Sequence, residues 1–311
     1  MYRAIRLALA LGLTALLSAC AGLTPTSPQS IPDDLPPNRL LTNLPFHAQD
    51  EYQCGPAALS MLLGQRNIAV APEQLKDRVY LPERKGSLQV EMVAAAREQG
   101  LLVYPLAPEL KAILREVDAG NAVLVMQNLA FGWYPQWHYA VVVGYDLNTQ
   151  DLILHSGLNA RQREPFWLFL RTWQRADNWA VVAMPAGTLP ATAEPLRYLK
   201  AAADLEQVGQ TASAEAAYRQ ASERWTDQPA PLLGLGNIAW NDGRQSEAVD
   251  HFSELVRRFP EYQAGWNNLA TGMEAMGCSE AAAQVRTCAA EQQENATEIG
   301  SEAACPIPVC R

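Results

Sequence analysis

The sequence predicts an α+β domain followed by an all-α array of paired helices, and two patterns support this prediction. Between about residues 45 and 185, helix-forming stretches come first and short β-branched runs separated by turns follow, which is typical of an α+β domain. Farther along, Gly209, Gly243 and Gly277 are spaced by 34 residues, as in an array of repeated helix pairs. The 311 residues are enough for two such domains.

The composition excludes several classes of protein. Hydrophobic residues make up 49% and charged residues 18%, so the chain has enough apolar side chains for a full core and is not of the disordered or fibrous type. The net charge of -9 would repel a phosphate backbone, which argues against nucleic-acid binding. After the first twenty residues, no stretch is long and apolar enough to span a bilayer.

The N-terminus has the pattern of a secretory signal. Arg3 and Arg6 precede the apolar run Leu7–Leu17, and small residues follow before Cys20. The string Leu17-Ser18-Ala19-Cys20 resembles the bacterial lipobox, which implies a signal over 1–19 and lipid attachment at Cys20. The alternative is an ordinary signal followed by a chance cysteine.

The resemblance to lipoproteins also implies a location. In such proteins an Asp after the modified cysteine favours retention in the inner membrane, whereas here the residue is Ala21. We therefore expect a protein of the cell envelope, anchored in the outer membrane and facing the periplasm. Residues 20–44, rich in Pro, Ser and Thr, are expected to form an extended tether.

The region 45–185 divides into predicted helices and predicted strands. Helices are expected over 55–65, 72–79, 88–99 and 108–118, and strands over 121–127, 138–145, 151–155, 165–170 and 178–184. This order favours helices packed on an antiparallel sheet.

Residues 195–296 resemble three tetratricopeptide repeats, joined to the first domain by a linker over 186–194. In the middle unit, Leu235-Gly236, Ala248, Phe252 and Pro260 stand at the offsets of such a repeat. The resemblance implies an all-α solenoid that recruits a peptide or a protein partner. An unrelated array of helical hairpins is the alternative.

Four of the six cysteines lie near the C-terminus. Clustered cysteines in an oxidising compartment ordinarily form disulfides, so Cys278, Cys288, Cys305 and Cys310 are candidates, with three pairings open. A zinc site is disfavoured because this segment has neither a histidine nor a close Cys-x-x-Cys pair. We expect the tail, 297–311, to be fastened to the last helix pair, and we expect no metal or cofactor.

The remaining cysteine, Cys54, stands where a nucleophile would be favoured. It precedes Gly55-Pro56 and a run of good helix formers, so it is expected at a helix N-terminus. Unpaired backbone N–H groups there favour an anion and predict a lowered thiol pKa. A buried structural cysteine at a helix start is the alternative.

A thiol nucleophile needs a base, and the chain has four histidines. His251 falls in the helical repeats and His47 in a loop, whereas His138 begins a strand after the aromatic segment Phe131-Gly132-Trp133-Tyr134. A histidine at a strand end beside aromatic residues suits a cleft wall, so His138 is the candidate base. The alternative is a histidine that only packs at the strand end.

Residues 45–156 resemble the papain-like cysteine peptidases that process the double-glycine leaders of bacteriocins. Three features match in order. The first is Gln49 followed by Cys54-Gly55-Pro56 and a helix, and the second is Gly86-Ser87-Leu88 with Ala94-Ala95-Ala96 and Gly100. The third is His138 followed by an apolar strand and Gly144. The resemblance implies that Cys54 attacks the scissile carbonyl while His138 takes and returns the proton. It also implies that Gln49 donates a hydrogen bond to the developing oxyanion.

The chain departs from this family at the third catalytic position. The family has an Asp that orients the histidine, and Ser156 stands in its place. A hydroxyl can hold the imidazole but cannot stabilise an imidazolium as a carboxylate does. Asn159 is a second candidate for this position.

The resemblance therefore implies a lipid-anchored cysteine peptidase that acts on an exported peptide or protein, with a repeat domain that recruits substrate or partner. Two alternatives stay open. The first is a binding or adaptor lipoprotein with a weak or inactive peptidase fold, which the missing Asp motivates. The second is an acyl transferase, such as a transpeptidase or amidase, that uses the same Cys-His pair.

Overall fold

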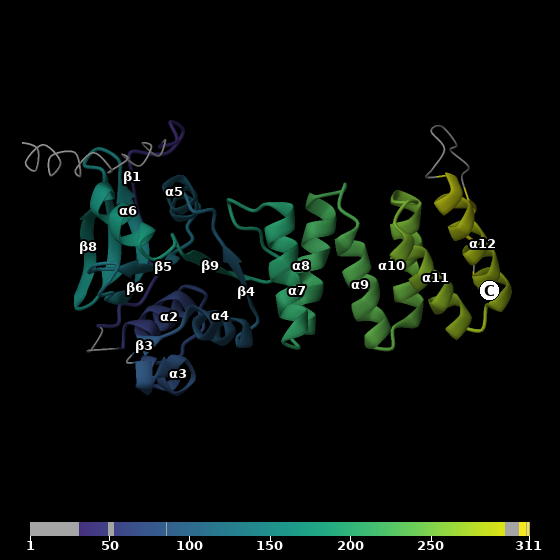
Figure 1. Ribbon diagram of the computed structural model, residues 1–311, viewed down its shortest axis with the longest axis horizontal. Coiled ribbons are helices and arrows are strands. Elements are labelled where there is room, and N and C mark those ends of the chain that lie inside the picture. Colours follow the sequence, from purple (N-terminus) through teal and green to yellow (C-terminus); the bar gives the residue numbers. More distant parts are fainter. Residues whose placement is uncertain (1–30, 49–52, 85, 296–304, 309, 311) are drawn as a thin grey trace, which may run out of the picture.

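The computed structural model describes residues 31–48, 53–84, 86–295, 305–308 and 310. An antiparallel sheet with helices packed on it occupies the first part of the chain, and a row of helices extends away from it (Figure 1). This arrangement confirms the predicted α+β class of the first domain and the helical nature of the C-terminal region. In the described part of the chain, no helix is long and apolar enough to cross a membrane.

The main sheet has seven strands, and its pairs are antiparallel in the order β4-β9-β5-β6-β7-β8, with β1 also beside β6. The strands are β1 (Asn38–Leu40), β4 (Leu101–Pro105), β5 (Val123–Asn128), β6 (Trp137–Asp146), β7 (Asp151–Ser156), β8 (Asn159–Pro165) and β9 (Ala180–Pro185). A separate hairpin pairs β2 (Tyr80–Leu81) with β3 (Gly86–Ser87) around the short 3-10 helix η2 (Pro82–Arg84). β6 is the longest strand, and it begins at the end of the sheet where β7 stops.

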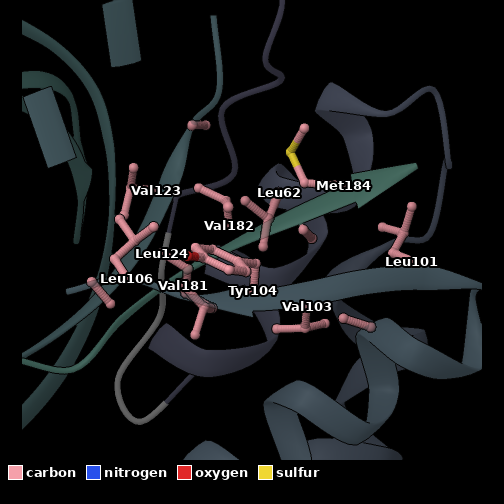
Figure 2. Close-up of a cluster of buried hydrophobic side chains, with 14 of the residues drawn as sticks. Leu62, Leu101, Val103, Tyr104, Leu106, Val123, Leu124, Val181, Val182 and Met184 are labelled. Atoms are coloured by element: carbon pink, nitrogen blue, oxygen red, sulfur yellow. The ribbon is translucent and has the colours of Figure 1, made fainter. Parts of the chain in front are cut away.

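The helices of this domain are α2 (Cys54–Gln65), α3 (Pro72–Val79), α4 (Gln89–Glu98), α5 (Leu110–Asp118) and α6 (Phe166–Gln174). α2 is buried along almost its whole length, as expected for a helix that is apolar on every side. Figure 2 shows Leu62 of α2 among buried side chains of β4, β5 and β9.

Polar side chains fasten the C-terminal end of α2 to the sheet. Gln65 donates to the carbonyl of Gly120 and accepts from the backbone N–H of Ala122, at 3.0 Å each. The Arg66 guanidinium donates to the carbonyl of Ala183 at 2.8 Å. These bonds, added to the apolar packing, fix where the opposite end of the helix, with Cys54, lies.

The predicted elements recur with small shifts at their ends, except for one. The strand predicted over 165–170 is wrong, because this stretch forms α6. Phe166, Phe169 and Trp173 are buried at positions i, i+3 and i+7, which is the period of a helix. A short run of aromatic and apolar residues does not distinguish a strand from a buried helix, and the period appears only when Trp173 is included.

Several strands escape prediction from the sequence. β8 is polar and mostly exposed, so it lacks the alternation of apolar residues that identifies a half-buried strand. β1 pairs with the last residues of β6 and packs closely on Gly144, where an added Cβ would lie 2.5 Å from the carbonyl oxygen of Arg39. Strands of this kind are specified by their partners rather than by their own composition.

The C-terminal region consists of α7 (Pro195–Gln207), α8 (Thr211–Arg224), α9 (Ala230–Asn241), α10 (Gln245–Arg258), α11 (Gln263–Ala275) and α12 (Ser279–Asn295), each packed on the next (Figure 1). The spaced glycines follow α7, α9 and α11. Gly209, Gly243 and Gly277 have φ values of 76°, 77° and 83°, which is the left-handed conformation that ends helices and favours glycine. The 34-residue period therefore marks the same turn in successive helix pairs.

The cysteines of the C-terminal region form two disulfides, Cys278–Cys310 and Cys288–Cys305, with Cα atoms 5.5 and 5.8 Å apart. They join the last helix pair to residues of the tail. Cys54 is the free cysteine of the described residues, and Cys20 lies outside them.

The sheet domain and the first helices of the row share one hydrophobic core. Arg97 of α4 forms an ion pair with Asp204 of α7 at 2.5 Å, and both side chains are largely buried. The buried carboxylate of Glu116 accepts hydrogen bonds from the backbone N–H and the hydroxyl of Thr192. The segment 186–194 is thus packed against the sheet domain rather than free of it.

Candidate active site

Cys54 is the first residue of α2, as its sequence context predicts. Its side chain is half-buried. The backbone N–H groups of Tyr139, Gly55 and Cys54 itself favour the anionic form of the thiol and act to lower its pKa. Two of these donors belong to the first turn of the helix, where backbone N–H groups have no partner within the helix.

The thiol pKa is not lowered as the helix position predicts. Burial raises the pKa of Cys54 above its ordinary value, and the backbone N–H groups of Tyr139, Gly55 and Cys54 offset only part of that rise. The expectation of a resting thiolate is therefore corrected. Helix position alone favours the anion, but the removal of the sulfur from water has the larger effect here.

Ser87 joins the beginning of α2 to the beginning of β6. Its hydroxyl packs on Gly55, and its carbonyl accepts a hydrogen bond from the Tyr139 phenol. β7 pairs with β6 only from Val141 onward, which leaves this part of β6 without that neighbour. His138 immediately precedes Tyr139, so the residues Cys54 and His138 belong to the same corner of the sheet.

His138 is half-buried as the second residue of β6. Its Nε2 lies 2.8 Å from the Oγ of Ser156, the last residue of β7. Burial lowers the pKa of His138, which favours the neutral imidazole. One ring nitrogen is thus held by a hydroxyl.

The two candidates for the third position have different surroundings. The hydroxyl of Ser156 is in contact with the imidazole, whereas the exposed Asn159 amide donates to Gln162 at 3.5 Å. Asp146 lies at the far end of β6 and accepts from Arg163. Among the described residues, the group within hydrogen-bond distance of His138 is a neutral one.

The other histidines are elsewhere. His155 is buried, its ring meets Phe46 edge-on, and its Nδ1 accepts from the backbone N–H of Arg161. His251 lies in α10 beside Glu247. His47 is in the segment between β1 and α2. Gln49, the expected oxyanion donor, lies outside the described residues.

Two residues of this corner were not singled out from the sequence as site residues. The Tyr139 phenol donates to the carbonyl of Ser87 at 3.3 Å, while its backbone N–H acts to lower the thiol pKa. The Ser87 hydroxyl is packed so closely on Gly55 that a Cβ there would overlap it. The strings Cys54-Gly55-Pro56 and Gly86-Ser87-Leu88 contain the signal, but only the fold shows that they touch.

The described residues contain no group of three or more His, Cys, Asp or Glu side chains that could hold a metal ion. The groups that the described residues bring to this corner are a thiol, a neutral imidazole and a hydroxyl. Such a set suits nucleophilic catalysis assisted by a general base.

Comparison with known proteins relates the same part of the chain to peptidases. Residues 41–181, which include Cys54, His138 and Ser156, match the Peptidase_C39 like family. A search of the curated proteins finds no match.

Solved structures resemble separate parts of the chain. A candidate C39-like peptidase from Bacillus anthracis has 15% identity and a TM-score of 0.39, covering 47% of this chain and 97% of its own. The peptidase domain of Streptococcus ComA, a bi-functional ABC transporter involved in quorum sensing, has 17% identity and a TM-score of 0.37, covering 46% and 99%. MamA has 15% identity and a TM-score of 0.32, covering 34% of this chain and 61% of its own.

Proposed function

We propose that this protein is a cysteine peptidase that hydrolyses peptide bonds with Cys54 as nucleophile and His138 as general base. The observation that supports the proposal most is the double contact of Ser87, which packs on Gly55 and accepts a hydrogen bond from Tyr139, because it brings the start of the helix with Cys54 to the strand end that bears His138. The match of residues 41–181 to the Peptidase_C39 like family supports the same activity.

In this mechanism the pair is neutral before substrate binds, in keeping with the directions of the pKa shifts of Cys54 and His138. His138 takes the thiol proton as the sulfur attacks the scissile carbonyl. It then gives that proton to the leaving amine, and an acyl-enzyme remains on Cys54. Water, deprotonated by His138, attacks the acyl carbon, and the proton returns to the sulfur as the acid product leaves.

Two sets of groups assist these steps. The backbone N–H of Cys54 and the side chain of Gln49 are the proposed donors to the oxyanion, each of which is typically worth about 2.7–4 kcal/mol of barrier. Ser156 is the proposed positioning residue, because its hydroxyl holds Nε2 of His138.

The remaining parts of the chain are proposed to deliver substrate at a membrane surface. Lipid at Cys20 would anchor the protein, on the outer membrane and facing the periplasm. The helices of 195–296 would recruit the exported substrate or a partner as tetratricopeptide repeats do. The left-handed glycines every 34 residues support the repeat assignment, and the two disulfides suit an oxidising compartment.

The test is covalent labelling of the full chain by a thiol-directed probe with a peptide-like recognition group. We expect labelling of the wild type at Cys54, none in Cys54→Ser, and strongly reduced labelling in His138→Ala. His251→Ala, far away in α10, is the matched control and should label like the wild type. Equal labelling of His138→Ala, wild-type and denatured protein would refute the proposal.

A second candidate is an adaptor that keeps the peptidase fold without catalysis. The contact between His138 and a hydroxyl, where the resembling family has a carboxylate, favours it. Under this alternative Cys54→Ala would leave the cellular phenotype intact, whereas substitutions on the inner face of the helical row would abolish it.

A further inference from the structure

An uncharged apolar patch projects from the end of the sheet at which β6 begins. It consists of six residues, Leu129, Phe131, Trp133, Tyr134, Trp137 and Leu158, with exposed fractions of 45%, 62%, 82%, 70%, 51% and 72%. The first four belong to the loop between β5 and β6, Trp137 is the first residue of β6, and Leu158 belongs to the turn between β7 and β8. Large apolar side chains this exposed mark a surface that contacts something else.

The loop and the turn are neighbours at one end of the sheet. Trp137 is joined to His138, Leu158 is two residues after Ser156, and the side chains of His138 and Ser156 touch. Within the loop, the rings of Phe131 and Trp133 stack with centroids 5.6 Å apart, and Tyr134 lies against Trp133. The rings thus support one another while they remain in solvent.

The chemistry of the patch suits the boundary between lipid headgroups and acyl chains. Residues 129–137 contain no Asp, Glu, Lys or Arg, and apart from Gln136 they combine Trp and Tyr with apolar residues. Trp and Tyr have an apolar ring and a polar atom, which is why they concentrate at membrane interfaces. Trp133 is 82% exposed, so it projects outward and does not line a groove that would enclose a peptide.

We infer that this patch rests in the interface of a lipid bilayer. The end of the sheet that carries Cys54 and His138 then faces the membrane. The chain before the sheet permits this orientation. β1 leaves the sheet beside Asp146, at the end opposite to the patch. Residues 31–37 are packed on the sheet domain, where Asp34 pairs with Arg115. The ten residues from Ala21 to Ser30 can span up to about 33–36 Å, and the ten residues of β6 rise about 33 Å.

The contact does not depend on catalysis by Cys54, so its test is independent of the proposed peptidase activity. The full chain is bound to phosphatidylcholine vesicles that contain brominated phosphatidylcholine, which quenches tryptophans located in the bilayer. The chain has eight tryptophans, and none lies before Trp133, so an N-terminal anchor adds no signal of its own. We expect most of the quenched emission to disappear in the double variant Trp133→Phe, Trp137→Phe.

Trp167→Phe is the matched control. Trp167 is 66% exposed, but it follows β8 at the end of the sheet opposite to the patch, and its replacement should leave the quenched emission unchanged. Circular dichroism would show that the variants keep the fold. Absence of quenching, or equal losses in the double variant and in Trp167→Phe, would overturn the membrane contact. An emission shift of Trp133 and Trp137 caused only by an uncharged apolar peptide would assign the patch to peptide binding instead.

Discussion

The Nε2 atom of His138 and the Oγ atom of Ser156 are 2.8 Å apart, on the neighbouring strands β6 and β7. The hydroxyl can hold the imidazole in place, but it has no charge with which to stabilise an imidazolium. Burial acts in the same direction, because it lowers the pKa of His138 and raises that of Cys54. Both shifts therefore favour a neutral thiol and a neutral imidazole over an ion pair.

Replacing Ser156 is expected to change how the reactivity of Cys54 depends on pH, more than it changes the position of Cys54. In Ser156→Asp, a carboxylate beside Nε2 should raise the pKa of His138, so that alkylation of Cys54 accelerates at lower pH than in the wild type. Ser156→Ala should slow labelling roughly fivefold, the equivalent of about 1 kcal/mol for one neutral hydrogen bond. Rates of iodoacetamide alkylation of Cys54, measured against pH, test both effects. Asn159→Ala is the control, and its rates should equal those of the wild type.

The wild-type alkylation profile itself tests the neutral pair. Because burial raises the pKa of Cys54, the rate should keep rising into the alkaline range and stay below that of a small free thiol at neutral pH. A plateau already reached below pH 7 would contradict this prediction, because it would mean that a thiolate and an imidazolium exist before substrate binds.

Acidification is expected to destabilise the fold through its buried histidines. Burial lowers the pKa of His138 and, together with Arg161, that of His155, so the unfolded chain binds more protons below pH 6.5 than the folded one. The free energy of unfolding should therefore decrease as the pH falls from 7 to 5, by at most about 1.4 kcal/mol per pH unit for each histidine. Urea unfolding at several pH values measures the slope.

The variant His155→Gln provides the comparison for that experiment, because it removes one titrating group from the buried side of the sheet. Its stability should depend less on pH than that of the wild type. A slope that is unchanged in His155→Gln and also in His138→Gln would show that other groups cause the acid sensitivity.

A methyl group on residue 55 should disturb the nucleophile. In Gly55→Ala the new Cβ overlaps the Ser87 hydroxyl, so either α2 or β3 must move, at a cost of about 1–3 kcal/mol of stability. Labelling of Cys54 should decrease as well, because the residue begins the displaced helix. The double variant Gly55→Ala, Ser87→Gly removes the atoms that collide and should recover both stability and labelling. Failure to recover would mean that residue 55 acts through backbone conformation instead.

The ion pair between Arg97 and Asp204 is expected to couple the sheet domain to the helical row. The two side chains are only 19% and 17% exposed, so Arg97→Ala should cost about 1–2 kcal/mol of stability. The matched control is Arg78→Ala, since Arg78 pairs with Glu98 at 59% and 49% exposure and should contribute less than about 0.5 kcal/mol. Thermal unfolding followed by circular dichroism would measure both, and equal effects would argue against a buried coupling.

Local physical chemistry made part of this architecture predictable from the sequence. Pro56 stands two residues after Cys54 and is followed by good helix formers, which determines a helix start. The β-branched run after His138 determines a strand. Gly209, Gly243 and Gly277 mark helix ends because few other residues adopt a positive φ without strain. Each of these features depends on residues close together in the chain.

The tertiary structure alone decided the relationships across the site. The pairing of β6 with β7, in which Val141 lies opposite His155, brings Ser156 and not Asn159 to His138. The direction of the Cys54 pKa shift depends on how much of the domain surrounds the sulfur. The pairing of Cys278 with Cys310 likewise depends on how the tail folds back on α12. Strand register, burial and disulfide pairing depend on many contacts between distant parts of the chain. No short stretch of sequence contains the information on all of these contacts.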